Sequence, residues 1–130
     1  MKQSIIFLLV IMMGCSAQKS ELLGKWKYTN EQGVYAEIWL NEDQIVLIDA
    51  DFFTVTLADY KIEDDTILLY YGEELQSKIP FKIISDGKFK INQGSEVEVS
   101  RFETNVQNTF DYSESTLSKI QQEFASRITE

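Results

Sequence analysis

Apolar and polar residues alternate in short runs between Leu22 and Phe102, and residues that favour turns separate the runs. A period of two puts every second side chain on the same face of an extended strand. Because the connections are short, we expect neighbouring strands to be antiparallel and to form one up-and-down meander that closes into a small barrel. The eight predicted strands are Gly24–Thr29, Val34–Leu40, Gln44–Ala50, Phe52–Ile62, Thr66–Tyr71, Ser77–Ile84, Lys88–Asn92 and Glu96–Phe102.

Two details of the strands carry further expectations. Pro80 has no backbone N–H donor, so its strand should lie at an edge of the sheet or contain a bulge. In the second strand, Tyr35, Glu37 and Trp39 share one face and the aliphatic residues share the other. The aliphatic face should meet the core, so the aromatic face points either outward or into the mouth of the barrel.

The end of the chain has a different period. Leu117, Ile120, Phe124 and Ile128 are spaced by three, four and four residues, which is typical of an amphipathic helix. Asp111 and Glu114 stand three residues apart in the arrangement of a capping pair. We therefore predict a helix over about residues 112–128 that packs its apolar stripe against the outside of the sheet.

The N-terminus has the pattern of a secretion signal. Lys2 is followed by nine consecutive apolar residues, Ile5–Met13, which span only about 14 Å as a helix and are too short to cross a bilayer of about 30 Å. The only cysteine follows directly, and Gly14-Cys15 resembles the lipobox of bacterial lipoproteins. The resemblance implies a signal peptide over residues 1–14, a lipidated Cys15 with a tether to residue 21, and a domain over residues 22–130. The alternative is an incidental thiol in a plain signal peptide.

The charge and the missing histidines exclude several functions. The chain has 12 Lys and Arg, 21 Asp and Glu and no histidine, for a net charge of −9; without residues 1–14, which contain Lys2 alone, the charge is −10. Binding of nucleic acid needs clustered basic residues, so no nucleic acid is expected as a partner. Catalysis by Ser-His-Asp or Cys-His sets and zinc bound by histidine are excluded. We expect neither an enzyme nor a cofactor or metal site.

The eight-stranded pattern, the following helix and three residues together resemble the lipocalin family and its small bacterial lipocalin-like relatives. Gly24-Lys25-Trp26 opens the first strand, and Arg101 stands near the end of the last. The resemblance implies that Trp26 lies across the closed end of the barrel and that Arg101 covers its ring in a cation–π contact. Eight strands in about 80 residues leave only a shallow cup.

Two functions of different classes fit this sequence. The first is binding of a small apolar or amphipathic ligand in the shallow barrel cavity, with Ile38, Phe53 and Tyr71 as candidate lining residues. The second is a non-enzymatic protein–protein interaction module, an inhibitor or assembly factor, whose barrel is filled and whose acidic surface binds a basic protein. In both cases the lipid on Cys15 anchors the protein to the bacterial cell envelope. Ser16 after the cysteine is compatible, by family analogy, with sorting to the outer membrane.

Overall fold

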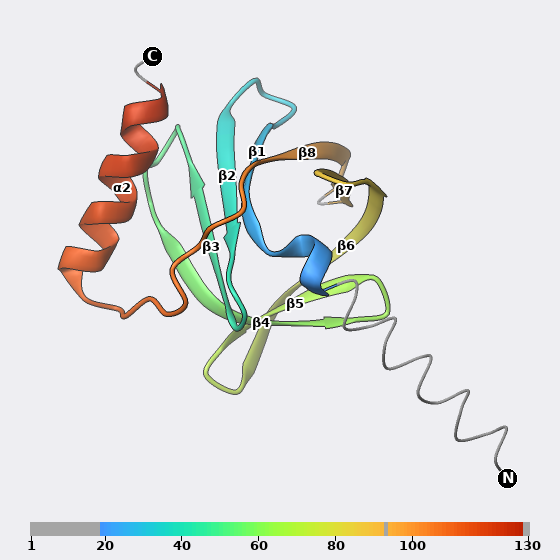
Figure 1. Ribbon diagram of the computed structural model, residues 1–130, viewed down its shortest axis with the longest axis horizontal. Helices are drawn as coiled ribbons and strands as arrows, with labels where there is room; N and C mark the ends of the chain where they lie inside the picture. Colours follow the sequence, from blue (N-terminus) through green and yellow to red (C-terminus); the bar gives the residue numbers. More distant parts are fainter. Residues whose placement is uncertain (1–18, 93, 129–130) are drawn as a thin grey trace, which may run out of the picture.

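The computed structural model describes residues 19–92 and 94–128 (Figure 1). In this part of the chain, a helical turn over residues 19–22 precedes a closed barrel in which each strand pairs antiparallel with the next and β8 returns to β1. The predicted fold, an up-and-down β-barrel with a C-terminal helix, is confirmed. The elements are β1 (Gly24–Thr29), β2 (Tyr35–Leu40), β3 (Gln44–Asp49), β4 (Thr56–Glu63), β5 (Thr66–Tyr71), β6 (Glu74–Ser85), β7 (Lys88–Asn92), β8 (Glu96–Glu103) and α2 (Glu114–Ile128).

The largest difference from the predicted strands is at the start of β4. The prediction begins that strand at Phe52, whereas the structure begins it at Thr56 after a turn and loop. The Asp49 carboxylate accepts hydrogen bonds from the backbone N–H groups of Asp51 and Phe52, each at 3.0 Å. This local turn ends β3 and leaves Phe53 with a positive φ of 52°, which is incompatible with a strand.

Strand β6 is longer than predicted, and Pro80 marks a change of partner within it. Residues from Glu74 to Pro80 pair with β5, and pairing with β7 begins at Phe81. The register shifts that involve β6 lie elsewhere, at Leu69/Tyr70 and at Ile83/Ser85, so Pro80 is at neither a bulge nor the edge of an open sheet. The proline is tolerated because it ends one ladder immediately before the next begins.

The barrel interior is filled by side chains. Its core residues are between 0% and 6% exposed to water. Five more apolar residues pack against this core and are half-buried: Tyr28, Leu47, Ile62, Ile83 and Val97. The centre of the barrel is therefore packed at the density of a protein core, and the cavities near it lie at its ends. The fully buried core residues form the following set. They are Leu22, Trp26, Ile38, Leu40, Ile45, Ala58, Tyr60, Ile67, Leu69, Ile79, Phe81, Phe89, Ile91 and Val99.

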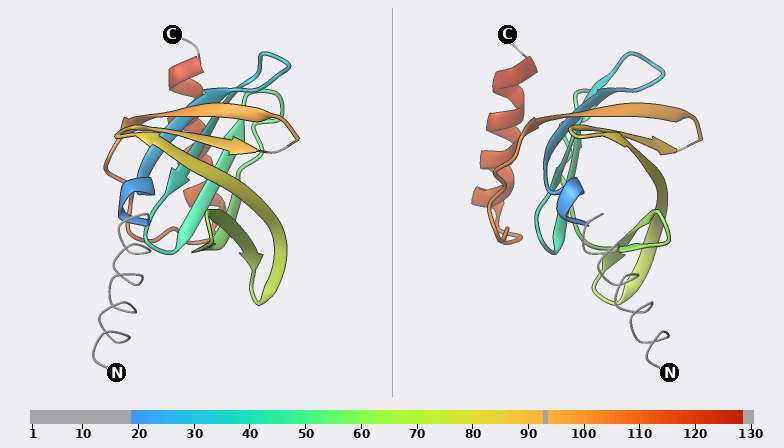
Figure 2. Two further views of the ribbon diagram at one scale, coloured as in Figure 1. Left: turned by 90° about the vertical axis from the view of Figure 1, so that its right-hand side faces the viewer. Right: turned by 45° about the vertical axis from the view of Figure 1, so that its right-hand side comes forward.

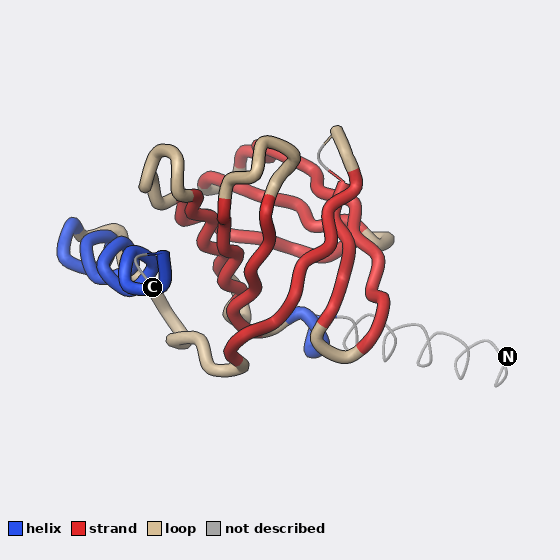
Figure 3. The backbone as a smooth tube through the Cα atoms, turned by 90° about the horizontal axis from the view of Figure 1, so that it is seen from above, coloured by secondary structure: helices blue, strands red, loops and turns tan. Residues whose placement is uncertain are grey.

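A second, smaller core lies outside the barrel. Helix α2 packs beside the ring of strands, as seen from above in Figure 3 and from two sides in Figure 2. Ile120 joins Trp39, Val46 and Leu57 from the outer face of the sheet, and Phe110 comes from the segment before the helix. The expectation that the apolar stripe packs against the outside of the sheet is confirmed.

The cap of α2 differs from the predicted pair. The helix begins at Glu114, and the Ser113 hydroxyl oxygen accepts a hydrogen bond from the Thr116 N–H at 3.3 Å. Asp111 lies outside the cap and accepts a hydrogen bond from the Ser113 N–H at 3.0 Å and one from the Thr116 hydroxyl at 2.6 Å. The Ser113 hydroxyl also donates to this carboxylate and has the largest effect; together the three donors lower the pKa of Asp111 from 3.8 to about 2.

We predict that Asp111→Asn lowers the midpoint of thermal unfolding at pH 7 and has little effect at pH 2. Because the folded-state pKa of Asp111 is depressed, its charge stabilises the fold above about pH 4, and this contribution is lost as the pH falls from about 4 to about 2. Circular-dichroism melts at both pH values measure the effect. The control, Asp51→Asn in the exposed loop, should melt like the parent. An equal loss at both pH values for Asp111→Asn would contradict the role of the charge.

Candidate functional site

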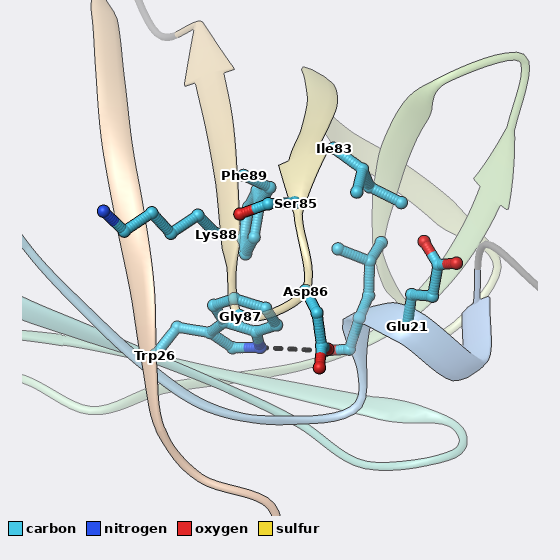
Figure 4. Close-up of a pocket in the computed structure, with 9 residues that line it drawn as sticks. Glu21, Trp26, Ile83, Ser85, Asp86, Gly87, Lys88 and Phe89 are labelled. Atoms are coloured by element: carbon cyan, nitrogen blue, oxygen red, sulfur yellow. Dashed lines mark hydrogen bonds between the residues drawn. The ribbon is translucent and has the colours of Figure 1, made fainter.

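Trp26 closes the end of the barrel at which the chain enters. Its side chain is 2% exposed, and its indole Nε1 donates a hydrogen bond to the Leu22 carbonyl at 2.9 Å (Figure 4). The Phe89 ring packs edge-to-face on Trp26 with 4.5 Å between centroids. The Arg101 guanidinium lies 4.5 Å from the centroid of the indole, within the range of a cation–π contact. The structure thus brings Trp26 and Arg101 together.

The same contact requires a glycine at position 24. A Cβ on Gly24 would stand 2.7 Å from the Glu103 carbonyl oxygen and 3.1 Å from Arg101 Nε, and the φ of Gly24 is +133°. Arg101 is held from its other side by the Glu21 carbonyl and, at 3.5 Å, by the Asp86 carboxylate. Gly24 and Arg101 therefore belong to one structural unit that fastens the first strand to the last.

A cavity of about 290 Å³ lies outside this closed end. Figure 4 shows Trp26 and Phe89 on one side of it and Glu21 on the other. Its lining combines apolar side chains with the charged side chains of Glu21, Asp86 and Lys88. The lining residues are Glu21, Leu22, Trp26, Ile83, Ser85, Asp86, Gly87, Lys88 and Phe89.

The three candidate ligand-lining residues lie in three different places. Ile38 is buried in the barrel interior. Phe53 lies in the loop before β4, where its ring packs edge-to-face on Phe124 of α2 at 5.6 Å between centroids. Tyr71 ends β5 and is 49% exposed. The structure does not bring them together in one cavity, because the interior is occupied by core side chains and the turn at Asp49 takes Phe53 out of the sheet.

A buried carboxylate lies between the barrel and α2. Glu37 is 1% exposed and faces outward from β2 with Tyr35 and Trp39. Its carboxylate accepts hydrogen bonds from the Tyr35 hydroxyl at 2.7 Å, from Trp39 Nε1 at 2.8 Å, and from Arg127 Nε and Nη2 at 2.7 and 2.6 Å. Four donors fill the four lone-pair positions of the carboxylate, which leaves none for a substrate. This group is a structural anchor.

A second cation extends the anchor. Lys25 is buried, and its Nζ lies 2.9 Å from Glu123, 3.3 Å from Glu103 and 4.4 Å from the centroid of the Trp39 ring. The hydrogen bonds from Arg127 to Glu37 raise the pKa of Arg127. The neighbourhood thus holds two cations and three carboxylates, linked in a chain of ion pairs that joins the helix to three strands, β1, β2 and β8. The sequence alone left the direction of the Tyr35 face open and gave Glu37 no partner.

Another cavity, of about 300 Å³, lies at the barrel mouth beside the loop before β4. Tyr28 and Leu47 line it from the barrel side, and Phe52 lines it from the loop. Burial and the charge of Asp49 raise the pKa of the Tyr28 hydroxyl. Phe52 is 78% exposed, so an aromatic ring stands free beside the opening.

A polar surface with several tyrosines lies on the outer face of β4 and β5. Asp59 is the cross-strand partner of Tyr70, and the two side chains share one face of the sheet. Tyr71 and Tyr112 are also exposed. Partial burial raises the pKa of the Tyr112 hydroxyl, and the nearby charges of Asp59 and Tyr71 raise it further. A cavity of about 280 Å³ lies here. Its lining residues are Asp59, Tyr60, Lys61, Tyr70, Gly72 and Glu73.

The described residues contain no group of three or more side chains suited to hold a metal ion. Within residues 19–92 and 94–128, the helices are too short or too polar to cross a membrane. Cys15, the predicted lipidation site, lies outside the described residues.

Comparison of the chain with models of protein families, with curated proteins and with solved structures found no match. The resemblance to lipocalins therefore stays a prediction from Gly24, Trp26 and Arg101. What the structure adds is the contact between the last two and the closed barrel around them.

We predict that Glu37→Gln destabilises the fold by about 3 kcal/mol, because it leaves Arg127 beside the buried site with only its longer ion pair to Glu123, at 3.6 Å. Urea unfolding measures the loss. Replacing both partners with apolar residues, Glu37→Leu with Arg127→Met, should recover much of it. The matched control is Glu98→Gln, whose exposed pair with Lys88 at 3.6 Å should change the free energy of unfolding by less than about 0.5 kcal/mol. Equal effects of Glu37→Gln and Glu98→Gln would contradict the anchor.

We also predict that Gly24→Ala destabilises the fold more than Gly87→Ala. Both glycines have positive φ, and the φ of Gly24, +133°, lies further than the φ of Gly87, +85°, from the left-handed region that other residues can adopt. Only Gly24 would also bring a Cβ against Glu103 and Arg101, whereas the space around Gly87 is open. The difference between the two variants in urea unfolding measures the clash together with the larger backbone strain, and equal losses would contradict both.

Proposed function

We propose that this protein is a lipid-anchored component of a bacterial cell envelope, at the outer membrane, and that its barrel is a protein–protein interaction module. The observation that carries the proposal is the filled interior, whose core side chains are 0–6% exposed. A carrier of the lipocalin type needs room inside the barrel. Here the barrel serves better as a rigid support for its outer surface.

The outer surface has features of a binding face. Phe52, Tyr71 and Tyr112 are exposed by 78%, 49% and 62%. Exposed aromatic rings on a rigid support are the residue type that most often dominates protein–protein binding energy. The net charge of −10 without residues 1–14 favours a basic partner and a fast, electrostatically steered encounter.

The anchor rests on the sequence pattern at Cys15. The described part of the chain begins at residue 19, only four residues later, and four residues reach at most about 14 Å. A lipid on Cys15 would therefore keep the barrel close to the membrane surface. Several acyl chains on one cysteine hold a protein stably, without basic residues to assist.

The second candidate is a carrier of a small apolar ligand at the barrel mouth. The cavity there, of about 300 Å³, lies beside Tyr28, Leu47 and the exposed ring of Phe52. Its size is at the lower limit of small-molecule sites. This observation favours a shallow, partly exposed ligand over one enclosed in the barrel.

Native mass spectrometry of the full-length protein, extracted in detergent from its own membranes, tests both parts. We expect the mass of a chain that begins at Cys15 with attached acyl groups, and a complex with a second protein that dissociates as the salt concentration is raised. A Cys15→Ser chain should lack the acyl mass and leave the membrane fraction. One small molecule bound to each barrel, with no protein partner, would overturn the interaction module in favour of the carrier. An unlipidated chain would overturn the anchor.

A further inference from the structure

We infer that the outer face of β4 and β5 is the docking surface of the interaction module and that it takes an arginine-bearing segment of the partner. We call this face the acidic tyrosine surface and define it by Asp59, Tyr70, Glu73 and Tyr112. The inference rests on the proposed function and adds to it a location and a chemistry.

Three neighbouring strands, β4, β5 and β6, build the part of the surface that lies on the sheet. Asp59 of β4 and Tyr70 of β5 are direct cross-strand neighbours, and Leu75 of β6 pairs with Tyr70 on its other side. The sheet therefore presents a carboxylate, a phenol ring and a leucine side by side on its outer face. Leu75 is 42% exposed, so the row is not covered by another element of the protein.

The segment before α2 brings in Tyr112. Gln44 of β3 holds this segment with its side-chain amide, which accepts a hydrogen bond from the Phe110 N–H at 2.7 Å and donates one to the Phe110 carbonyl at 2.8 Å. Gln44 is itself the cross-strand neighbour of Asp59. In Figure 1 the segment passes beside β3 and β4 before it enters the helix. Tyr112 is thus held near Asp59 although it is 62% exposed.

The pocket in the surface suits one long cationic side chain. Its volume of about 280 Å³ is small, and its lining includes the carboxylates of Asp59 and Glu73 and the ring of Tyr70. The turn between β2 and β3 lies beside β4, because the Tyr60 N–H donates a hydrogen bond to the Asp43 carbonyl at 3.1 Å, and this turn adds the exposed carboxylates of Glu42 and Asp43. Among the described residues that line the pocket, Lys61 is the single cation.

The chain already places one cation on this surface. Lys61 Nζ lies 5.4 Å from the centroid of the Tyr70 ring, and Lys61 itself is exposed. A cation–π contact at an exposed site is weak, so an incoming guanidinium can displace the lysine.

Arginine fits this pocket better than lysine does. A guanidinium is planar and can donate two parallel hydrogen bonds to one carboxylate while it stacks on an aromatic ring. Asp59 and Tyr70 offer that pair of contacts on neighbouring strands. Anionic lipid and nucleic acid are disfavoured by the same carboxylates.

A titration with a hexa-arginine peptide tests the inference. The full-length protein in a neutral detergent is titrated at low salt and followed by amide NMR shifts, with hexa-lysine and hexa-glutamate peptides as comparisons. We expect saturable shifts in β4, β5 and the segment before α2, binding of hexa-lysine roughly fivefold weaker, and no binding of hexa-glutamate. The absence of saturable binding, or equal affinity for arginine and lysine, would overturn the inference.

Variants locate the site. Asp59→Asn and Tyr112→Ala should each weaken hexa-arginine binding roughly fivefold, whereas Tyr112→Phe, which keeps the ring, should bind like the parent. Asp51→Asn and Phe52→Ala are matched controls, because they remove one carboxylate and one exposed aromatic ring from the loop before β4, away from the proposed surface. All five are surface changes, and unchanged thermal melts establish that they fold. Equal weakening by the controls would reduce the binding to general charge attraction and overturn the site.

The two proposals fail in different ways. A protein complex in native mass spectrometry that is unaffected by Asp59→Asn and Tyr112→Ala would overturn this location and leave the interaction module standing. A small molecule in each barrel, with no protein complex, would overturn the module itself. A protein complex that weakens in both variants and survives in Asp51→Asn supports both.

Discussion

A fully buried carboxylate on the outside of the barrel needs a full set of donors, and Glu37 obtains them only when α2 docks. Tyr35 and Trp39 supply two donors from the same strand, but the positive charge comes from Arg127 in the last turn of the helix. Docking of the helix removes Glu37 from water, and Arg127 supplies the counter-ion that compensates for the lost hydration. The position of α2 is therefore determined by charge as well as by the apolar contacts of Ile120 and Phe124.

Docking of the helix has consequences away from the ion pair. The segment between β8 and α2 must cross the outer face of the sheet, where Gln44 binds the backbone of Phe110. That crossing adds Phe110 to the smaller core and brings Tyr112 near Asp59 on the outer side of β4. Packed core side chains occupy the inside of the barrel, whereas the buried ion pairs lie outside it, between the sheet and α2.

Local patterns sufficed for most of the fold. Alternation and short turns placed the barrel strands, and the spacing of Leu117, Ile120 and Phe124 placed the helix and its apolar face. Phe53 was misplaced because a single hydrogen-bonding side chain, Asp49, turns the chain where alternation alone would continue it. The filling of the interior could not be predicted either, because it depends on how side-chain volumes fit together in three dimensions, which no local sequence pattern contains. The ion pair of Glu37 could not be predicted for a related reason, since its partner Arg127 lies 90 residues away along the chain.

That separation bears on how the protein is made. The strands from Gly24 to Glu103 are synthesised before Arg127, whose guanidinium binds the Glu37 carboxylate. Until α2 docks, Glu37 stays in water and the apolar outer face formed by Trp39, Val46 and Leu57 is uncovered, so an incomplete chain is less stable than the barrel with its helix. A protein exported as an extended polypeptide, as the N-terminal pattern predicts, would gain from that lower stability, because docking of the helix completes the structure on the far side of the membrane.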